Sequence, residues 1–141
     1  MTTSLNGILL IKKMEGFRGT AYSCPGGTLT IGYGTTRGVS PNMTVTEAQA
    51  DMLLRRDLVF IENQINSLGL RLKQNQFDAL ASLVYNIGWG NFVKSTLLRL
   101  TRLDPDHTGI PNEFRRWIYA AGKPMAGLSH RREAEIALYR L

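Results

Sequence analysis

Glycine is unevenly distributed along this chain of 141 residues, and that distribution constrains the fold more than any other feature. Seven of the 14 glycines lie between Gly16 and Gly38. Glycine favours tight turns and weakens helices, so this segment predicts β-turns and short strands. The flanking segments instead carry apolar residues at helical spacing. The sequence therefore predicts an α+β fold in which a β-hairpin is surrounded by helices.

The glycine-dense segment is expected to form two short strands, at residues 20–23 and 28–33. The turn Cys24-Pro25-Gly26-Gly27 joins them. Alternate residues of a strand face opposite sides, so the apolar Leu29 and Ile31 share one side and Thr30 lies on the other. We expect the apolar side to be buried and Thr30 to point away from it.

Helices are expected on both sides of the hairpin. The first covers residues 4–15, with Ser4 or Thr3 as its N-cap. The run Thr46-Glu47-Ala48-Gln49 is a capping box that opens a long helix to about Leu68. Further helices are expected at residues 74–86, 92–102, 112–120 and 128–140.

These elements predict a single domain over residues 1–141, made of two lobes. A small N-terminal β-hairpin lobe and a larger C-terminal helical lobe are joined by the long helix, with an active-site cleft between them. Trp89 and Trp117 are expected in the core or at the junction of the lobes.

The charge of the chain favours polyanionic partners. The 17 Lys and Arg residues against 11 Asp and Glu residues give a net charge of +6. Such a protein is attracted to nucleic acid, anionic lipid or an acidic cell wall, and the charge alone does not select among them.

Three adjacent arginine pairs contribute to this charge: Arg55 and Arg56, Arg115 and Arg116, and Arg131 and Arg132. Neighbours on a helix point about 100° apart, so each pair is expected to divide between a salt bridge and solvent. No motif places aromatic residues for base stacking beside them. We therefore expect no nucleic-acid partner, and contact with an anionic cell-envelope surface instead.

Metals, cofactors and disulfides are not expected. Cys24 is the sole cysteine, so no internal disulfide can form, and the two histidines, His107 and His130, are too far apart for a typical metal motif.

Glu15 is the most informative candidate for chemistry. It lies four residues after Ile11 and seven after Ile8, on the helix stripe that is expected to face the core. A carboxyl group there is poorly hydrated, which favours its protonated form near neutral pH. A positioned carboxylic acid is what glycosidic bond cleavage needs as its general acid. A structural salt bridge to Arg18 is the alternative interpretation.

The spacing of Glu15, Cys24 and Thr30 resembles the signature of phage-type lysozymes, glycoside hydrolase family 24. That family places eight residues between its Glu and an Asp or Cys, then five before a Thr, and this chain matches without a gap. The resemblance continues through most of the chain, at residues 74–80, 85–88, 95–98, 116–123, 127–128 and 131–135.

The resemblance implies hydrolysis of the β-1,4 bond between N-acetylmuramic acid and N-acetylglucosamine in bacterial peptidoglycan. Glu15 would protonate the leaving oxygen, Cys24 stands at the second catalytic position, and Thr30 would orient a water. The two-carboxylate scheme predicts inversion when a water fits between acid and base. A neutral thiol is a poor base at pH 7, so Cys24 is either activated, limited to a lesser role, or only a small turn residue.

Two other functions are compatible with this resemblance: a lytic transglycosylase, and a non-catalytic peptidoglycan-binding module. The favoured interpretation is a monomeric muramidase, an endolysin acting on glycan strands without a cofactor. Near the N-terminus, the apolar run Ile8-Leu9-Leu10-Ile11 is too short for a secretory signal or a membrane span. We therefore expect synthesis in the host cytoplasm and release to the periplasm through a holin pore or another delivery route.

Overall fold

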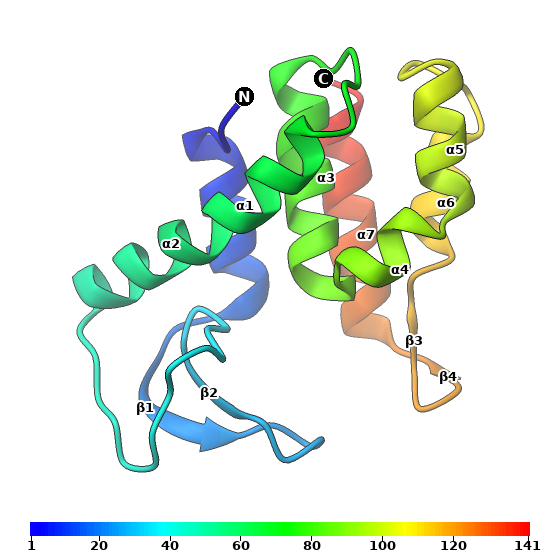
Figure 1. Cartoon of the computed structure of the whole chain (residues 1–141). Coiled ribbons are helices and arrows are strands. Elements are labelled where there is room, and N and C mark those ends of the chain that lie inside the picture. Colours follow the sequence, from blue (N-terminus) through cyan, green and yellow to red (C-terminus); the bar gives the residue numbers. More distant parts are fainter. The chain divides into compact units, whose positions relative to one another are not determined.

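The computed structural model describes all residues 1–141, which form two compact units (Figure 1). One unit is Ile11–Phe60, called here the hairpin unit; the other combines Met1–Leu10 with Ile61–Leu141 and is called the helical unit. The borders between the units fall inside two helices, α1 (Leu5–Glu15) and α2 (Glu47–Asn66). Helices combined with small antiparallel sheets confirm the predicted α+β class.

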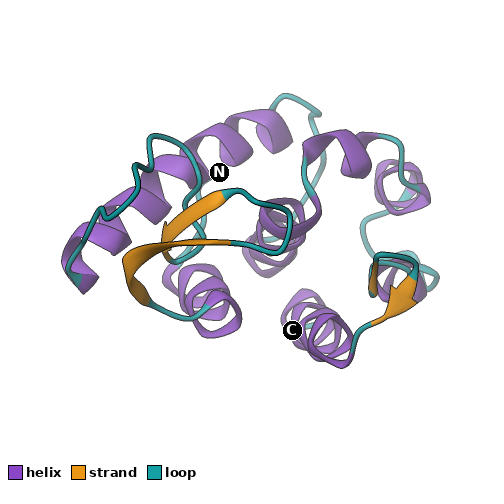
Figure 2. Ribbon diagram, turned by 90° about the horizontal axis from the view of Figure 1, so that it is seen from below, coloured by secondary structure: helices purple, strands orange, loops and turns teal.

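The hairpin unit contains strands β1 (Arg18–Ser23) and β2 (Leu29–Gly32), which pair antiparallel (Figure 2). The turn between them forms as predicted, because the Gly27 N–H donates to the Cys24 carbonyl at 2.7 Å. Gly27 has a φ of +83°, a conformation that is costly for residues with a Cβ atom. Observed β1 begins two residues earlier than expected, and β2 is shorter at both ends.

The apolar side of β2 is buried as expected, and the opposite side, which carries Thr30, is buried as well. Thr30 is 3% exposed and Ile31 is 0% exposed. The reason lies in helix α2, which covers the second side. A Cβ added at Gly32, two residues from Thr30, would lie 3.0 Å from the Cβ atom of Ala50. A strand pattern alone cannot show that a helix packs on its polar side.

Helix α2 begins with the predicted capping box. The Thr46 N–H donates to Gln49 Oε1 at 2.9 Å, and the Gln49 N–H donates to Thr46 Oγ1 at 3.2 Å. One turn later, Asp51 pairs with Lys12 of α1 at 2.5 Å and with Arg55 at 2.7 Å. The hydrogen bond from Lys12, followed by that from Arg55, lowers the pKa of Asp51. These pairs connect α2 to the end of α1 that precedes the hairpin.

The helical unit is built around α3 (Gln74–Ile87), which lies beside α7 (Ala126–Tyr139) (Figure 1). Its core includes Phe77, Leu80 and Leu83 from α3. Trp89 and Trp117 are partly buried and pack against this core, which confirms that both contribute to packing.

The helix expected at 92–102 is instead two helices, α4 (Trp89–Val93) and α5 (Thr96–Leu103). The interruption between α4 and α5 has a local cause that the spacing of apolar residues does not indicate. The Ser95 hydroxyl accepts a hydrogen bond from the Leu98 N–H at 3.1 Å and so caps α5 at its N-terminus.

The helix expected at 112–120 is also shorter, because α6 covers Ile110–Arg115. A second antiparallel pair, β3 (Tyr119–Ala120) and β4 (Lys123–Pro124), follows it. The turn between them places Ala121 at a φ of 51° and Gly122 at 77°, both in the left-handed region. Gly122 and Pro124 were the available signals for a turn here.

Arg131 and Arg132 are both buried, so the expectation that one of them would reach solvent was wrong. Arg131 Nε lies 3.2 Å from the Glu135 carboxylate and Arg132 Nε lies 2.8 Å from it. The Ser82 hydroxyl also donates to Glu135 at 2.6 Å, and Arg132 donates to Asn86 Oδ1 at 2.7 Å. A carboxylate bound by two guanidinium groups therefore joins α7 to α3 inside the helical unit.

Replacing this carboxylate is expected to destabilise the fold strongly. Glu135→Gln leaves two buried guanidinium groups without a counter-charge, which should lower the free energy of unfolding by about 3 kcal/mol. Urea unfolding measures this loss. The matched control is Glu133→Gln on the same helix, whose exposed pair with Arg115 should contribute less than about 1 kcal/mol. Equal losses in the two variants would contradict a stabilising role for the buried carboxylate.

Candidate active site

The pairing of β1 with β2 brings the second and third predicted site residues together. Tyr22 of β1 is the direct partner of Thr30 on β2. Directly paired residues point to the same side of a hairpin, and Cys24 follows Tyr22 by two residues. The register therefore predicts that Tyr22, Cys24 and Thr30 share one side, and the side-chain contacts agree with it.

Cys24 and Thr30 are in direct contact. Cys24 Sγ lies 3.0 Å from Thr30 Oγ1, and Thr30 Oγ1 donates to the Thr28 carbonyl at 3.2 Å. Either atom could donate in the contact between Cys24 and Thr30. The hydroxyl has one proton, so whenever that proton is given to Thr28, the Cys24 thiol is the donor to Thr30. The Thr30 oxygen and the Cys24 sulfur then each keep capacity to accept a hydrogen bond.

Glu15 is the last residue of α1 and leads directly into the hairpin. Gly16 follows with a φ of +73°, and its N–H donates to the Lys12 carbonyl at 2.9 Å, which closes the helix. Along the predicted stripe, Ile8 and Ile11 are buried and Glu15 is half-buried. The carboxyl group therefore retains access to solvent at the end of the buried stripe.

The segment after Glu15 is fixed by aromatic contacts within the hairpin unit. The rings of Phe17 and Tyr33 lie 5.6 Å apart between centroids, and Lys12 Nζ lies 5.2 Å from the Tyr33 ring centre. Tyr33 is buried. These contacts connect the end of α1 to the residue that follows β2, so they restrict how far Glu15 can move relative to the hairpin.

Tyr22 and Arg18 belong to the same site, although the sequence reasoning did not select them. The pKa of the Tyr22 phenol is raised by burial and by Cys24, with a smaller contribution from Glu15, while Arg18 opposes the shift. The Arg18 guanidinium lies 4.1 Å from the centre of the Tyr22 ring. Tyr22 is therefore a protonated hydrogen-bond donor at neutral pH. The signal available in the sequence was the position of Tyr22, two residues before Cys24 in the strand that leads into the turn.

The hairpin unit thus contains four groups that could take part in chemistry. They are the carboxyl group of Glu15, the thiol of Cys24, the buried hydroxyl of Thr30 and the phenol of Tyr22. No group of three or more His, Cys, Asp or Glu side chains is arranged to hold a metal ion. The chemistry that these groups offer is proton donation by Glu15 and hydrogen bonding to a water or a sugar hydroxyl.

The amino-acid sequence of this chain is similar to those of known proteins over nearly its whole length. The sequence model described as Phage lysozyme matches residues 12–135. The endolysin of Acyrthosiphon pisum secondary endosymbiont phage 1 is 41% identical over 144 residues, covering 99% of this chain and 98% of that protein.

Two solved structures are each similar to the structure of this chain over nearly its whole length. The muramidase domain of SpmX from Asticaccaulis excentricus has a TM-score of 0.91 and 36% identity, and the match covers 99% of this chain and 98% of that one. A mutant of the lysozyme of Salmonella phage P22 has a TM-score of 0.86 and 40% identity, with coverages of 100% and 99%.

Proposed function

Because this chain belongs to the phage lysozyme family, we propose that it is a muramidase. Its function is lysis of peptidoglycan. The bond that we assign is the β-1,4 linkage between N-acetylmuramic acid and N-acetylglucosamine, and the proposed catalytic residues are Glu15, Cys24 and Thr30. The observation that supports this assignment most is the direct contact of Cys24 with Thr30, at the family's spacing after Glu15.

Glu15 is the proton donor in this proposal. Its carboxylic acid gives a proton to the leaving glycosidic oxygen while a water adds to the anomeric carbon. The proton released by that water passes to solvent, and Glu15 regains a proton before the next cycle. One water is consumed for each bond cleaved. Half-burial suits this role, since the carboxyl must both meet the substrate and exchange its proton.

Thr30 and Cys24 position the attacking water. When Thr30 gives its own proton to Thr28, the thiol donates to Thr30 Oγ1, and the sulfur serves as a hydrogen-bond acceptor for the water. The Thr30 oxygen, which already receives the thiol proton and gives its own to Thr28, keeps one acceptor position. A water that donates to both atoms would be held beside the hairpin with its lone pair free to attack.

The substrate and place of action follow from the same proposal. A monomer acts on glycan strands in the cell wall, without a metal or cofactor, after release from the host cytoplasm through a holin pore or another route. None of the helices combines the length and the apolar character that crossing a lipid bilayer requires.

Purified cell-wall sacculi test whether the chain cleaves or only binds. The proposal predicts that the protein releases soluble muropeptides and clears a sacculus suspension. The control is the same suspension with heat-unfolded protein. Sedimentation of intact protein with intact sacculi, without release of sugar, would identify a binding module and contradict the proposal.

Salt is expected to slow lysis. Between about 50 and 300 mM salt the screening length falls from roughly 14 to 6 Å, which weakens the attraction of a protein with a net charge of +6 for an anionic wall. We expect the clearing rate of sacculi to fall severalfold over this range, with less change on short soluble glycan fragments. A flat profile on sacculi would show that the positive charge does not contribute to wall binding.

A further inference from the structure

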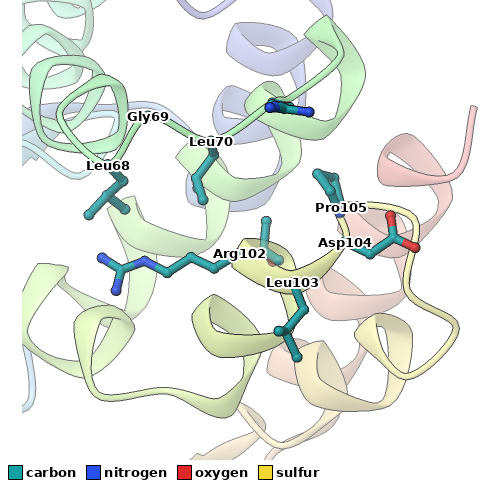
Figure 3. A pocket seen from close by; sticks show the side chains of 9 residues that line it. Leu68, Gly69, Leu70, Arg102, Leu103, Asp104 and Pro105 are labelled. Carbon is teal, nitrogen blue, oxygen red and sulfur yellow. The ribbon is translucent and has the colours of Figure 1, made fainter.

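The helical unit contains a pocket that includes none of the proposed catalytic residues. Its volume is about 560 Å³, and it is lined by residues 68–71 and 101–105; we call it the basic pocket (Figure 3). One wall is the loop that follows α2, where Gly69 turns the chain with a φ of +65°. The other is the end of α5 and the residues after it.

Two guanidinium groups in the basic pocket have no acidic partner. Arg71 and Arg102 both line it, and neither has a carboxylate within 4.0 Å. Arg99, one turn before Arg102 on α5, is exposed and equally unpaired. By contrast, the exposed Arg115 and Arg116 are paired with Glu133 and Glu113. The basic pocket therefore concentrates positive charge that the fold itself does not neutralise.

The single acidic side chain in the pocket is directed elsewhere. Asp104 Oδ1 accepts a hydrogen bond from the Asp106 N–H at 2.9 Å, which fixes the carboxylate to its own loop. Figure 3 shows the Arg102 side chain extending toward Leu68, on the side opposite the Asp104 carboxylate. Arg102 is consequently oriented for an anion from outside the chain. Guanidinium groups bind phosphate and carboxylate oxygens well, because their N–H donors match the spacing of those oxygens.

An exposed apolar residue adjoins these charges. Leu103 lines the pocket and is 70% exposed, and Leu68 and Leu70 line it as half-buried residues. Unpaired arginines beside an exposed leucine are typical of surfaces that bind anionic bilayers, where the charges meet phosphates and the apolar side chain enters the interface. The carboxylates of a cell wall would satisfy the arginines but would leave Leu103 in water.

We propose that the basic pocket binds the phosphate group of an anionic phospholipid at a bilayer surface, with Leu103 inserted into the interface. This membrane contact is independent of bond cleavage and does not involve Glu15, Cys24 or Thr30. It would hold the protein at a membrane that borders the cell wall while it acts on its substrate.

Co-sedimentation with lipid vesicles tests the two arginines. The full chain is mixed with vesicles of phosphatidylcholine and phosphatidylglycerol, or of phosphatidylcholine alone. We expect binding only to the anionic vesicles, weakened about tenfold by the double substitution Arg71→Gln with Arg102→Gln. The matched control, Lys123→Gln with Arg140→Gln, removes the same charge from exposed residues of the same unit outside the basic pocket and should weaken binding less than about threefold.

Leu103→Gln tests insertion, with Met52→Gln as its control. Both residues are 70% exposed, and Met52 lies on α2 in the hairpin unit. We expect Leu103→Gln to weaken binding to anionic vesicles several times more than Met52→Gln does. Thermal unfolding of each variant confirms that its fold is retained.

Three results would overturn the proposal. The first is an equal loss of vesicle binding in the two double variants. That result would show that binding depends on the net charge of the protein and not on the basic pocket. The second is equal binding by the Leu103 and Met52 variants. The third is a pocket variant that keeps its vesicle binding but loses binding to purified sacculi, because that would assign the basic pocket to the cell wall.

Discussion

A Glu15→Gln variant is expected to lose peptidoglycan lysis by about 100-fold or more while keeping its fold. Glutamine has nearly the same shape as glutamic acid, but its amide cannot give a proton to the leaving oxygen. Glu15 is half-buried at the end of α1, and the helix closes there through the N–H of Gly16. The substitution leaves that backbone bond in place.

Clearing rates of sacculi, measured beside thermal unfolding, test this prediction. Glu47→Gln is the matched control, since it makes the same chemical change at an exposed residue of the hairpin unit. The control should lyse at close to the rate of the unsubstituted protein. A folded Glu15→Gln protein that retains a substantial fraction of the lysis rate would remove Glu15 from the mechanism.

Substitution of Cys24 is expected to slow lysis less than substitution of Glu15 does. Cys24→Ser should lose most of the activity, roughly tenfold, because the shorter C–O bond moves the acceptor atom away from Thr30 and the water between them is held less well. Cys24→Asp should recover much of it, since a carboxylate can both hold the water and accept its proton. The lysis rates of the three proteins, compared after equal folding is confirmed, measure these effects.

Thiol modification provides an independent control for Cys24. It is the sole cysteine and is half-buried, so a small thiol reagent labels one position. The adduct should block lysis by filling the water site, and the same reagent should leave Cys24→Asp unaffected. If Cys24→Ser lyses as fast as the unsubstituted protein, the thiol is only a packing residue and Thr30 must hold the water with backbone groups.

The preferences of individual residues for turns and helix caps were enough to predict the parts of the fold that depend only on residues close together in the sequence. The turn at Cys24-Pro25-Gly26-Gly27 and the capping box of Thr46 and Gln49 are set within four residues each, and both formed as expected. The register of the hairpin then brought Cys24 to Thr30, so the contact between two candidate residues follows from the turn.

Features that depend on distant segments could not be predicted in the same way. Thr30 is buried because α2 covers its side of the strand, and Arg131 and Arg132 are buried because α7 packs on α3. The spacing of Arg131, Arg132 and Glu135 on one helix indicates pairing. It does not indicate that all three leave solvent, since that depends on packing against another helix.

The mass of the newly formed sugar ends shows whether the protein cleaves peptidoglycan by hydrolysis. Sacculi are digested in water enriched in ¹⁸O, and the released muropeptides are analysed by mass spectrometry. Hydrolysis predicts that every new N-acetylmuramic acid end carries one added water with the heavy oxygen, and that Glu15→Gln releases at least about 100-fold less of this product. Fragments lighter by one water, with no heavy oxygen at the cleaved end, would show that an anhydro ring closes instead and would contradict the assignment as a muramidase.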